Sequence, residues 1–258
     1  MSVLVEITSK DNPKIQKIAK LQTSARYRKE TGLFAVEGLR VCDDCVDNGI
    51  EIETLIITDE FYKKQKSTLE KYISKARETL IVKSYLFEKI ADTKNPQGIL
   101  AVGKIPQKTA DNINVNGRYI ALENIADPSN LGAISRTAEA IGIDGIIVSA
   151  TGCDPYSPKV LRASMGTVLR MEIIVADDLV GTLKSSGLKL FGCVVSGGKD
   201  IREAEFCDGT IVIIGNEANG LTADIKQISE NITIPMSGSA ESLNAAAAAA
   251  IALWELRR

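Results

Sequence analysis

The sequence predicts an α/β protein in which a smaller α/β domain precedes a C-terminal domain built on a mainly parallel sheet. Two observations along the chain indicate this fold class. Short apolar runs rich in β-branched residues alternate with longer segments of helical periodicity, as is typical of α/β domains. Several of these runs end in turns rich in glycine, serine and asparagine, at the place where open parallel sheets bind ligands.

The first domain is predicted to span residues 1–106. A polar stretch without hydrophobic periodicity follows, and residues 107–117 are predicted to be a linker. Within the first domain, helices are expected over residues 12–21, 39–47, 68–76 and 84–90, and strands over residues 33–36, 50–57 and 99–102.

The second domain is predicted to span residues 118–258. Continuous apolar runs such as residues 211–214 favour strands that are buried on both faces of a parallel sheet. The last helix is expected to open at Ser242 and to run through six consecutive alanines, residues 245–250. The strands of this domain are expected over residues 119–122, 146–148, 171–175, 188–195, 211–214 and 231–234.

The helix after the strand at residues 119–122 lies in the densest motif of the chain. Asp127 and the residues after it form a turn and a helix start with polar caps. Ile134, Ala138 and Ile141 then recur at helical spacing and define its apolar face. Arg136 lies about 200° around the helix from Ile134, so it is expected to project away from that face.

The composition limits what the protein can do. The chain has no histidine, which excludes a Ser-His-Asp triad, a Cys-His pair and a histidine metal site. Any proton transfer must then fall to a carboxylate, Lys, Tyr, Cys, an unusually placed Arg or the substrate itself. The cysteines are five in number and scattered, and the lone pair Cys42 and Cys45 has no second pair to complete a metal site.

The termini and charge distribution add two expectations. No run of about eighteen apolar residues occurs, and the N-terminus lacks the layout of a signal peptide, so we expect a cytoplasmic protein with reduced thiols. Residues 1–106 carry 18 basic against 15 acidic residues, and residues 107–258 carry 13 against 18. The basic residues gather between positions 10 and 29, where they form either a solvated helix face or a surface that contacts RNA phosphates: Lys10, Lys14, Lys17, Arg26 and Arg28.

Polar turns follow four of the predicted strands and mark the candidate ligand site. Neither GxGxxG nor GxxxxGK[ST] occurs, so the usual dinucleotide and triphosphate fingerprints are missing. Each turn alone fits ordinary strand-to-helix geometry, and only their joint arrangement argues for a ligand. The turns contain Asn124 and Asp127, Ser196, Gly215 to Glu217, and residues 237–244.

Three segments resemble the signature motifs of the SpoU (TrmH-type) RNA 2′-O-ribose methyltransferases, in the knotted SPOUT superfamily. They read NIADPSNLGAISRTAEAIG, IVIIGNEANGL and ITIPMSGSAESLNAAAAAAIALWE, and their order and C-terminal position match the family. Residues 1–106, with SKDNPKIQKIAKL, FAVEGLRV and DTKNPQGILAV, are similar to the ribosomal-L30e-like substrate-binding domain found in many members.

The resemblance implies a deep trefoil knot in the C-terminal domain and a homodimer with its sites near the subunit interface. The run of alanines would let a threaded helix pack closely on neighbouring backbone. S-adenosylmethionine is the implied cofactor, and no metal is called for. Its implied contacts are Ser196, Gly215, Asn216, Ile234, Met236 and Leu243.

The resemblance also implies the catalytic residues. Arg136 matches the motif-one arginine, and we expect it to bind a phosphate and to stabilise the developing alkoxide, because a guanidinium resists deprotonation. Four further residues match the motifs and are expected to orient substrate and loops: Asn124, Glu217, Ser242 and Asn244.

The predicted function is therefore methylation of a ribose 2′-hydroxyl in structured RNA, with ribosomal RNA as the expected substrate. The same reaction on transfer RNA is the nearest alternative. A non-catalytic RNA-binding protein that keeps the knot is an alternative of another class. A nucleotide-binding oxidoreductase is disfavoured by the missing glycine fingerprint.

Overall fold

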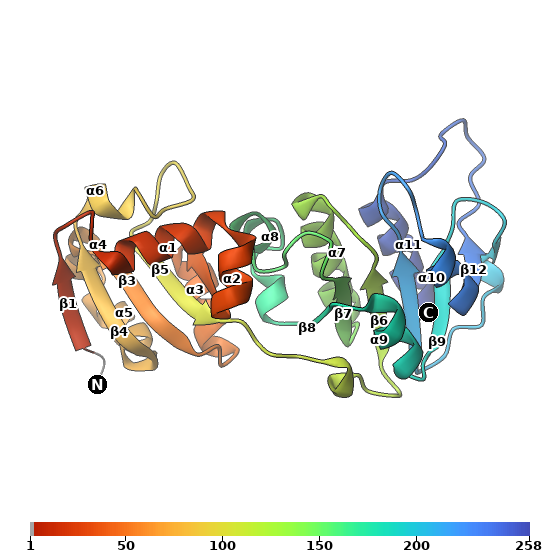
Figure 1. The fold of residues 1–258 in the computed structure, drawn as a ribbon, viewed down its shortest axis with the longest axis horizontal. Coiled ribbons are helices and arrows are strands. Elements are labelled where there is room, and N and C mark those ends of the chain that lie inside the picture. The colour runs from red at the N-terminus through yellow and green to blue at the C-terminus, as the bar shows by residue number, and fades with distance from the viewer. Residues whose placement is uncertain (1–2) are drawn as a thin grey trace. The chain divides into compact units, whose positions relative to one another are not determined.

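The computed structural model describes residues 3–258, which form two compact units (Figure 1). The first unit extends to Pro106 and also includes Tyr156–Leu161. The second unit comprises Gln107–Pro155 and Arg162–Arg258. Each unit is built on its own β-sheet.

The first unit contains a five-stranded mixed sheet in the order β1-β4-β3-β5-β2. β1, β4 and β3 are parallel, whereas β5 runs antiparallel to both β3 and β2. The strands are β1 (Val3–Ile7), β2 (Leu33–Glu37), β3 (Ile52–Thr58), β4 (Ala76–Val82) and β5 (Ile99–Lys104). The helices are α1 (Pro13–Thr23), α2 (Ala25–Thr31), α3 (Leu39–Asp47), α4 (Asp59–Lys64), α5 (Lys66–Lys75) and α6 (Ser84–Phe87).

One face of this sheet is covered by α1, whose residues Ile15, Ile18 and Leu21 point into a buried core with Leu80 and Leu100. The sequence missed four elements of the unit: β1, β4, α2 and α4. β4 carries Arg77 and Glu78 among its apolar residues, so its strand conformation depends on pairing with β1 and β3, which local sequence does not reveal.

The second unit contains a seven-stranded sheet in which every pair of neighbours is parallel, which confirms the predicted parallel sheet. The order is β10-β12-β9-β11-β6-β7-β8. The strands are β6 (Arg118–Leu122), β7 (Gly145–Ser149), β8 (Glu172–Ala176), β9 (Lys189–Cys193), β10 (Lys199–Asp200), β11 (Thr210–Ile214) and β12 (Glu230–Thr233).

Helices pack on both faces of this sheet. On one face, α9 and α10 cover a buried core formed by alternate residues of the central strands, such as Ala121, Ile147 and Ile213. On the other face, α7 and α11 pack against each other, and they contact β7 and β11. The helices of the unit are α7 (Pro128–Ile141), α9 (Leu179–Ser185), α10 (Ala223–Ile228) and α11 (Ala245–Arg257). α8 (Pro158–Ala163) is divided between the units, since its residues up to Leu161 belong to the first unit.

Two segments of the second unit differ from the sequence expectation. The stretch 107–117 contains a short 3-10 helix, Ala110–Asn112, and it buries Ile113 in the core of the unit. α11 begins at Ala245 and not at Ser242, because the side chain of Asn244 caps the helix by accepting from the backbone N–H groups of Ala246 and Ala247. Ser242 and Leu243 therefore stay in the preceding loop.

Within residues 3–258, none of the helices combines the length and the apolar composition needed to cross a membrane.

We predict that Gly132→Ala destabilises the second unit. A Cβ at Gly132 of α7 would overlap the side chain of Ala163 and lie 2.8 Å from the backbone nitrogen of Ser164. Alanine favours a helix by about 1 kcal/mol over glycine, but forcing atoms into a packed contact costs about 1–3 kcal/mol or more, so we expect a net loss. Urea denaturation measures this decrease in the free energy of unfolding.

Gly238→Ala is the control for this prediction, since no heavy atom outside its own neighbours lies within 4 Å of a Cβ placed there. We expect a change within about 0.5 kcal/mol for this variant. Equal effects of the two substitutions would show that the contact at Gly132 is not tight.

Candidate functional site

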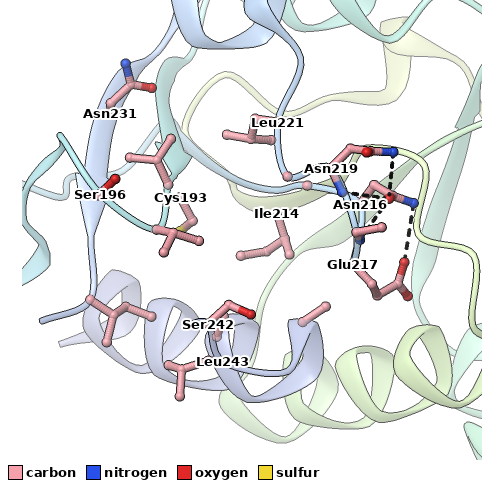
Figure 2. A pocket seen from close by; sticks show the side chains of 18 of the residues that line it. Cys193, Ser196, Ile214, Asn216, Glu217, Asn219, Leu221, Asn231, Ser242 and Leu243 are labelled. Atoms are coloured by element: carbon pink, nitrogen blue, oxygen red, sulfur yellow. Dashed lines mark hydrogen bonds between the residues drawn. The ribbon is translucent and has the colours of Figure 1, made fainter. Parts of the chain in front are cut away.

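A cavity of about 580 Å³ lies at the carboxyl ends of β9, β11 and β12 (Figure 2). This volume suits a small-molecule cofactor, and the position is the one expected for a ligand site in a parallel α/β sheet. Four segments supply most of the wall: the loop after β9, the turn after β11, β12 with the residues that follow it, and the start of α11. Its apolar side chains include Ile214, Leu221, Ile234, Met236 and Leu243.

The turn after β11 folds back closely on itself. A Cβ at Gly215 would lie 2.6 Å from the carbonyl oxygen of Gly220, so only glycine permits this approach. The backbone groups of Asn216 and Gly220 bond each other at 3.2 and 2.9 Å. The side-chain oxygen of Asn216 accepts from the N–H groups of Ala218 and Asn219 at 3.0 and 3.1 Å. The turn is therefore a rigid part of the wall.

The carboxylate of Glu217 joins this turn to the start of α7. It accepts from the side-chain nitrogen of Asn130 at 2.8 Å, and from the backbone N–H groups of Ala126 and Asp127 at 3.2 and 3.3 Å. Partial desolvation raises the pKa of Glu217, but the hydrogen bonds from Asn130 and the backbone outweigh this, so the pKa lies below its usual value. Glu217 is therefore an ionised anchor and a poor proton acceptor.

Asn130 extends the junction to the last helix. Its side-chain oxygen accepts from the side-chain nitrogen of Asn244 at 3.1 Å, and the Asn244 oxygen caps α11. The path Glu217–Asn130–Asn244 thus connects the segments that begin α7, follow β11 and begin α11. We did not predict Asn130 from the sequence. The available signal was a polar residue one turn before Ile134 on the apolar face of the helix, and Asn130 is indeed buried.

Asn124 stabilises the loop between β6 and α7. It has a left-handed φ of 55°, its backbone N–H donates to the Ser149 hydroxyl at 2.7 Å, and its side-chain oxygen accepts from the hydroxyls of Ser149 and Thr151. Its carbonyl accepts from the Asn216 side chain at 2.8 Å. Through this hydrogen bond, Asn124 stabilises the turn after β11.

The motif resemblance is matched by comparisons with known protein families. The sequence model of the SpoU rRNA methylase family matches residues 117–254, and that of the MRM3-like substrate binding domain matches residues 12–101. The chain belongs to the SpoU rRNA methylase family. This confirms the resemblance seen in the three motifs.

SpoU-family proteins resemble the chain over nearly its whole length. It is 28% identical over 255 residues to RlmP of Bacillus subtilis (strain 168), named a 23S rRNA (guanosine(2553)-2′-O)-methyltransferase, with 98% of this chain and 99% of that protein covered. The structure of an AdoMet-bound rRNA methyltransferase from Sinorhizobium meliloti has a TM-score of 0.88 and 30% identity, covering 98% and 97% of the two chains. AviRb of Streptomyces viridochromogenes, solved with its cofactor AdoMet, has a TM-score of 0.84 and 26% identity, covering 95% and 97%.

The SpoU-type pocket brings together most of the residues singled out in the sequence. All six candidate cofactor contacts line it: Ser196, Gly215, Asn216, Ile234, Met236 and Leu243. Glu217, Ser242 and Asn244 line it as well. Among residues 3–258, those lining the pocket do not include Asn124 or Arg136. Arg136 lies exposed on α7, as its helical position predicts.

Four of the five candidate RNA contacts in the first unit lie at its surface, and one is buried. Lys10 and Lys17 are exposed, Lys14 forms an ion pair with Glu78, and Arg26 forms one with Glu30 at 2.6 Å. The prediction that Arg28 contacts RNA is wrong. It is only 4% exposed and donates to the carbonyl of Leu21 at 2.5 Å, so its guanidinium holds α1 and α2 together and does not reach an RNA phosphate.

We predict that Glu217→Ala lowers the free energy of unfolding by about 1–2 kcal/mol at neutral pH, a value reduced from that of a buried charged group because Glu217 is exposed. The folded-state pKa lies below the unfolded one, so the stabilisation is complete at neutral pH and is lost as pH falls through the folded-state pKa. Urea denaturation from pH 7 downward should show wild type and variant converging below the usual Glu pKa of about 4.3.

Glu241→Ala provides the matched control, since Glu241 lies exposed in the loop before α11. We expect this variant to change stability by less than about 0.5 kcal/mol at any of these pH values. A pH-independent loss in Glu217→Ala would contradict an anchoring role for the ionised carboxylate.

Proposed function

We propose that this protein transfers a methyl group from S-adenosylmethionine to the 2′-hydroxyl of a ribose in ribosomal RNA. The observation that carries the proposal is the pocket, where the turns of the second and third motifs meet and all six candidate cofactor contacts face one cavity. RlmP of Bacillus subtilis, which matches nearly the whole chain, is named for the same reaction on 23S rRNA, and the similar protein from Sinorhizobium meliloti is named an rRNA methyltransferase. With ribosomal RNA as substrate, we infer that the protein works in the cytoplasm.

The pocket fits the cofactor chemically. Ile214, Ile234 and Leu243 offer an apolar surface for adenine, and Gly215 lets the turn after β11 fold back on Gly220 to form the adjoining wall. Bound S-adenosylmethionine supplies a methyl group that is already activated as a sulfonium. The residues of this chain then need to align the ribose hydroxyl and to stabilise the charge that develops on its oxygen as the hydroxyl proton leaves to water.

We assign the stabilisation of that negative charge to Arg136. A guanidinium stays protonated in proteins, so Arg136 is a cation that binds an RNA phosphate and stabilises the alkoxide, and is not a base. Glu217 holds the loops in place as an anion. Asn124 and Asn244 position the same loops through their hydrogen bonds, and Ser242 lies in the pocket wall, where it can contact substrate.

A second copy of the chain fits this arrangement. Arg136 lies on the exposed side of α7, and the neighbouring α11 carries Trp254, which is 65% exposed, and Ile251, which is 39% exposed. An exposed apolar face of this kind suits an interface between subunits. We therefore propose a homodimer through the C-terminal domain, with Arg136 near the interface.

We also propose the trefoil knot that the SpoU resemblance implies. The strand order supports it, because β11, late in the chain, lies between β6 and β9, and α11 packs beside α7. Alanines 245, 249 and 252 are buried in α11, and such small side chains allow the close packing that threading demands.

The first unit is proposed to bind the RNA. Lys10 is exposed in the turn before α1, and Lys17 is exposed on the helix. Exposed basic residues of this kind can bind the phosphates of a folded RNA. The match of residues 12–101 to a substrate-binding domain supports this role. We propose residues 1–106 as this domain, residues 107–117 as the connection and residues 118–258 as the methyltransferase domain.

The decisive experiment measures transfer of tritium from methyl-labelled S-adenosylmethionine to RNA from a methylation-deficient host. We expect label in a 2′-O-methyl nucleoside of large ribosomal RNA. Arg136→Ala should lower kcat by about 10²–10³-fold, because it removes one stabilising donor, while cofactor affinity stays unchanged. Arg136→Lys keeps the positive charge but loses the planar guanidinium, so its kcat should lie between those of wild type and Arg136→Ala.

Label on a base would overturn the reaction but keep the SpoU fold. Label in transfer RNA alone would overturn the substrate. Full activity in Arg136→Ala would remove Arg136 from the catalytic site.

The homodimer makes a separate prediction. Trp254→Glu places a charge in the proposed apolar interface, and we expect it to weaken dimerisation by about 2 kcal/mol or more, which is roughly thirtyfold. Sedimentation velocity measures the change. Lys184→Glu on α9, which covers the opposite face of the sheet, is the control and should leave the dimer intact. A wild-type protein that sediments as a monomer at micromolar concentration would contradict the proposal.

A further inference from the structure

Met165 has an unusual backbone conformation for its residue type. Among residues 3–258, two residues other than glycine have a positive φ, Asn124 at 55° and Met165 at 53°. Asparagine tolerates this left-handed region, whereas methionine adopts it at a cost in conformational energy. Asn124 belongs to the candidate site, and strained residues cluster at functional sites, where the surrounding structure maintains them. The conformation of Met165 therefore points to a function for the segment that carries it.

The side chain of Met165 lies largely outside the core. It is 40% exposed, although the residues on either side of it, Ser164 and Gly166, are buried. A strained backbone is thus maintained for a side chain that adds little to the packing of the interior. One exposed apolar residue is ordinary on a protein surface, so its role depends on what lies beside it.

The segment that carries Met165 is attached to α7 at both ends. Before Met165, the backbone at Gly132 of α7 comes so close to Ala163 that a Cβ at position 132 would overlap it. After Met165, the guanidinium of Arg170 donates two hydrogen bonds to the carboxylate of Glu139 on α7, at 2.5 and 2.8 Å. These bonds hold the pKa of Glu139 below its usual value, so the ion pair persists at neutral pH.

Arg136 lies between these two attachments along α7. It follows Gly132 by four residues and precedes Glu139 by three, which places it about 40° and 60° around the helix axis from them. Arg136 therefore projects from the same side of α7 as the residues that hold the segment, and Met165 lies within that segment. Both side chains are exposed, so a cation and an apolar group lie next to each other on this surface.

We propose that the side chain of Met165 packs against a base of the bound RNA, beside the phosphate that Arg136 binds. The inference rests on the proposed function. A nucleobase is a flat aromatic ring, and the thioether of methionine makes favourable contacts with aromatic rings. A nucleotide that is held at its phosphate and at its base has its ribose fixed between them, which is the alignment that methyl transfer to the 2′-hydroxyl requires.

The test compares Met165→Ala with wild type in the transfer of label from S-adenosylmethionine to large ribosomal RNA from a methylation-deficient host. Alanine removes the thioether and keeps a Cβ, so the backbone strain stays nearly the same. We expect kcat/KM for the RNA to fall about two- to tenfold, because a contact with a base is lost. The affinity for S-adenosylhomocysteine, measured by titration calorimetry, should stay unchanged. Met165→Leu keeps an apolar side chain of similar volume and should restore kcat/KM.

Met165→Gly separates the contact from the strain. Glycine adopts a φ of 53° freely, so this variant should lose kcat/KM as Met165→Ala does, while its melting temperature stays unchanged or rises. Val115→Ala is the matched control, since Val115 is 68% exposed and lies before β6, at the amino ends of the parallel strands and away from the pocket. This variant should methylate the RNA as wild type does.

Unchanged kcat/KM in Met165→Ala overturns the inference and leaves the proposed function standing. A loss that Met165→Leu does not reverse shows that an apolar contact is not what matters, and it overturns the inference too. Weaker dimerisation of Met165→Ala in sedimentation velocity assigns the side chain to a contact between subunits, with the same consequence. Absence of methyl transfer by the wild-type protein overturns the proposed function and this inference with it.

Discussion

The ionised carboxylate of Glu217 is the interaction on which the site depends. It accepts hydrogen bonds from the backbone N–H groups of Ala126 and Asp127, which directly precede α7 at the helix end that carries partial positive charge. A carboxylate suits that position better than any neutral side chain, and the lowered pKa of Glu217 expresses this preference. Through Asn130, the same junction reaches Asn244 and the cap of α11. Three segments far apart in sequence are thereby held at one edge of the sheet.

This junction links the pocket to the exposed side of α7. Asn130 and Arg136 are six residues apart on one helix, which corresponds to a rise of about 9 Å and a rotation of about 240°. The side chain of Asn130 therefore faces the protein interior, and that of Arg136 faces solvent. Gly132 lies between them and lets the backbone near Ala163 approach closely, so the position of α7 is fixed from both sides. A cation placed in this way can serve a bound RNA while the interior face maintains the pocket.

The sequence was sufficient to predict features that depend on the local pattern of residues. It was insufficient to predict features that depend on contacts with distant segments of the chain. The buried run of β11 and the turn at Gly215 could be recognised because their residue types leave few other options. β4 could not, since Arg77 and Glu78 interrupt its apolar pattern and only pairing with two neighbours makes it a strand. Arg28 was misassigned for the same reason, because its burial follows from the packing of α1 on α2. Asn244 fixes the start of α11 by a side-chain bond that spacing alone does not reveal.

The lack of histidine makes physical sense in such a site. The carboxylate nearest to the pocket is committed to four nitrogen donors, and protonating it would loosen the loops that it holds. A general base in this position would therefore work against the structure. Because the sulfonium activates the methyl group, the proposed reaction needs no strong base, and a fixed cation such as Arg136 would stabilise the alkoxide while its proton leaves to water. The polar groups around the pocket, Glu217 and Asn244 among them, can then hold the loops that form its wall.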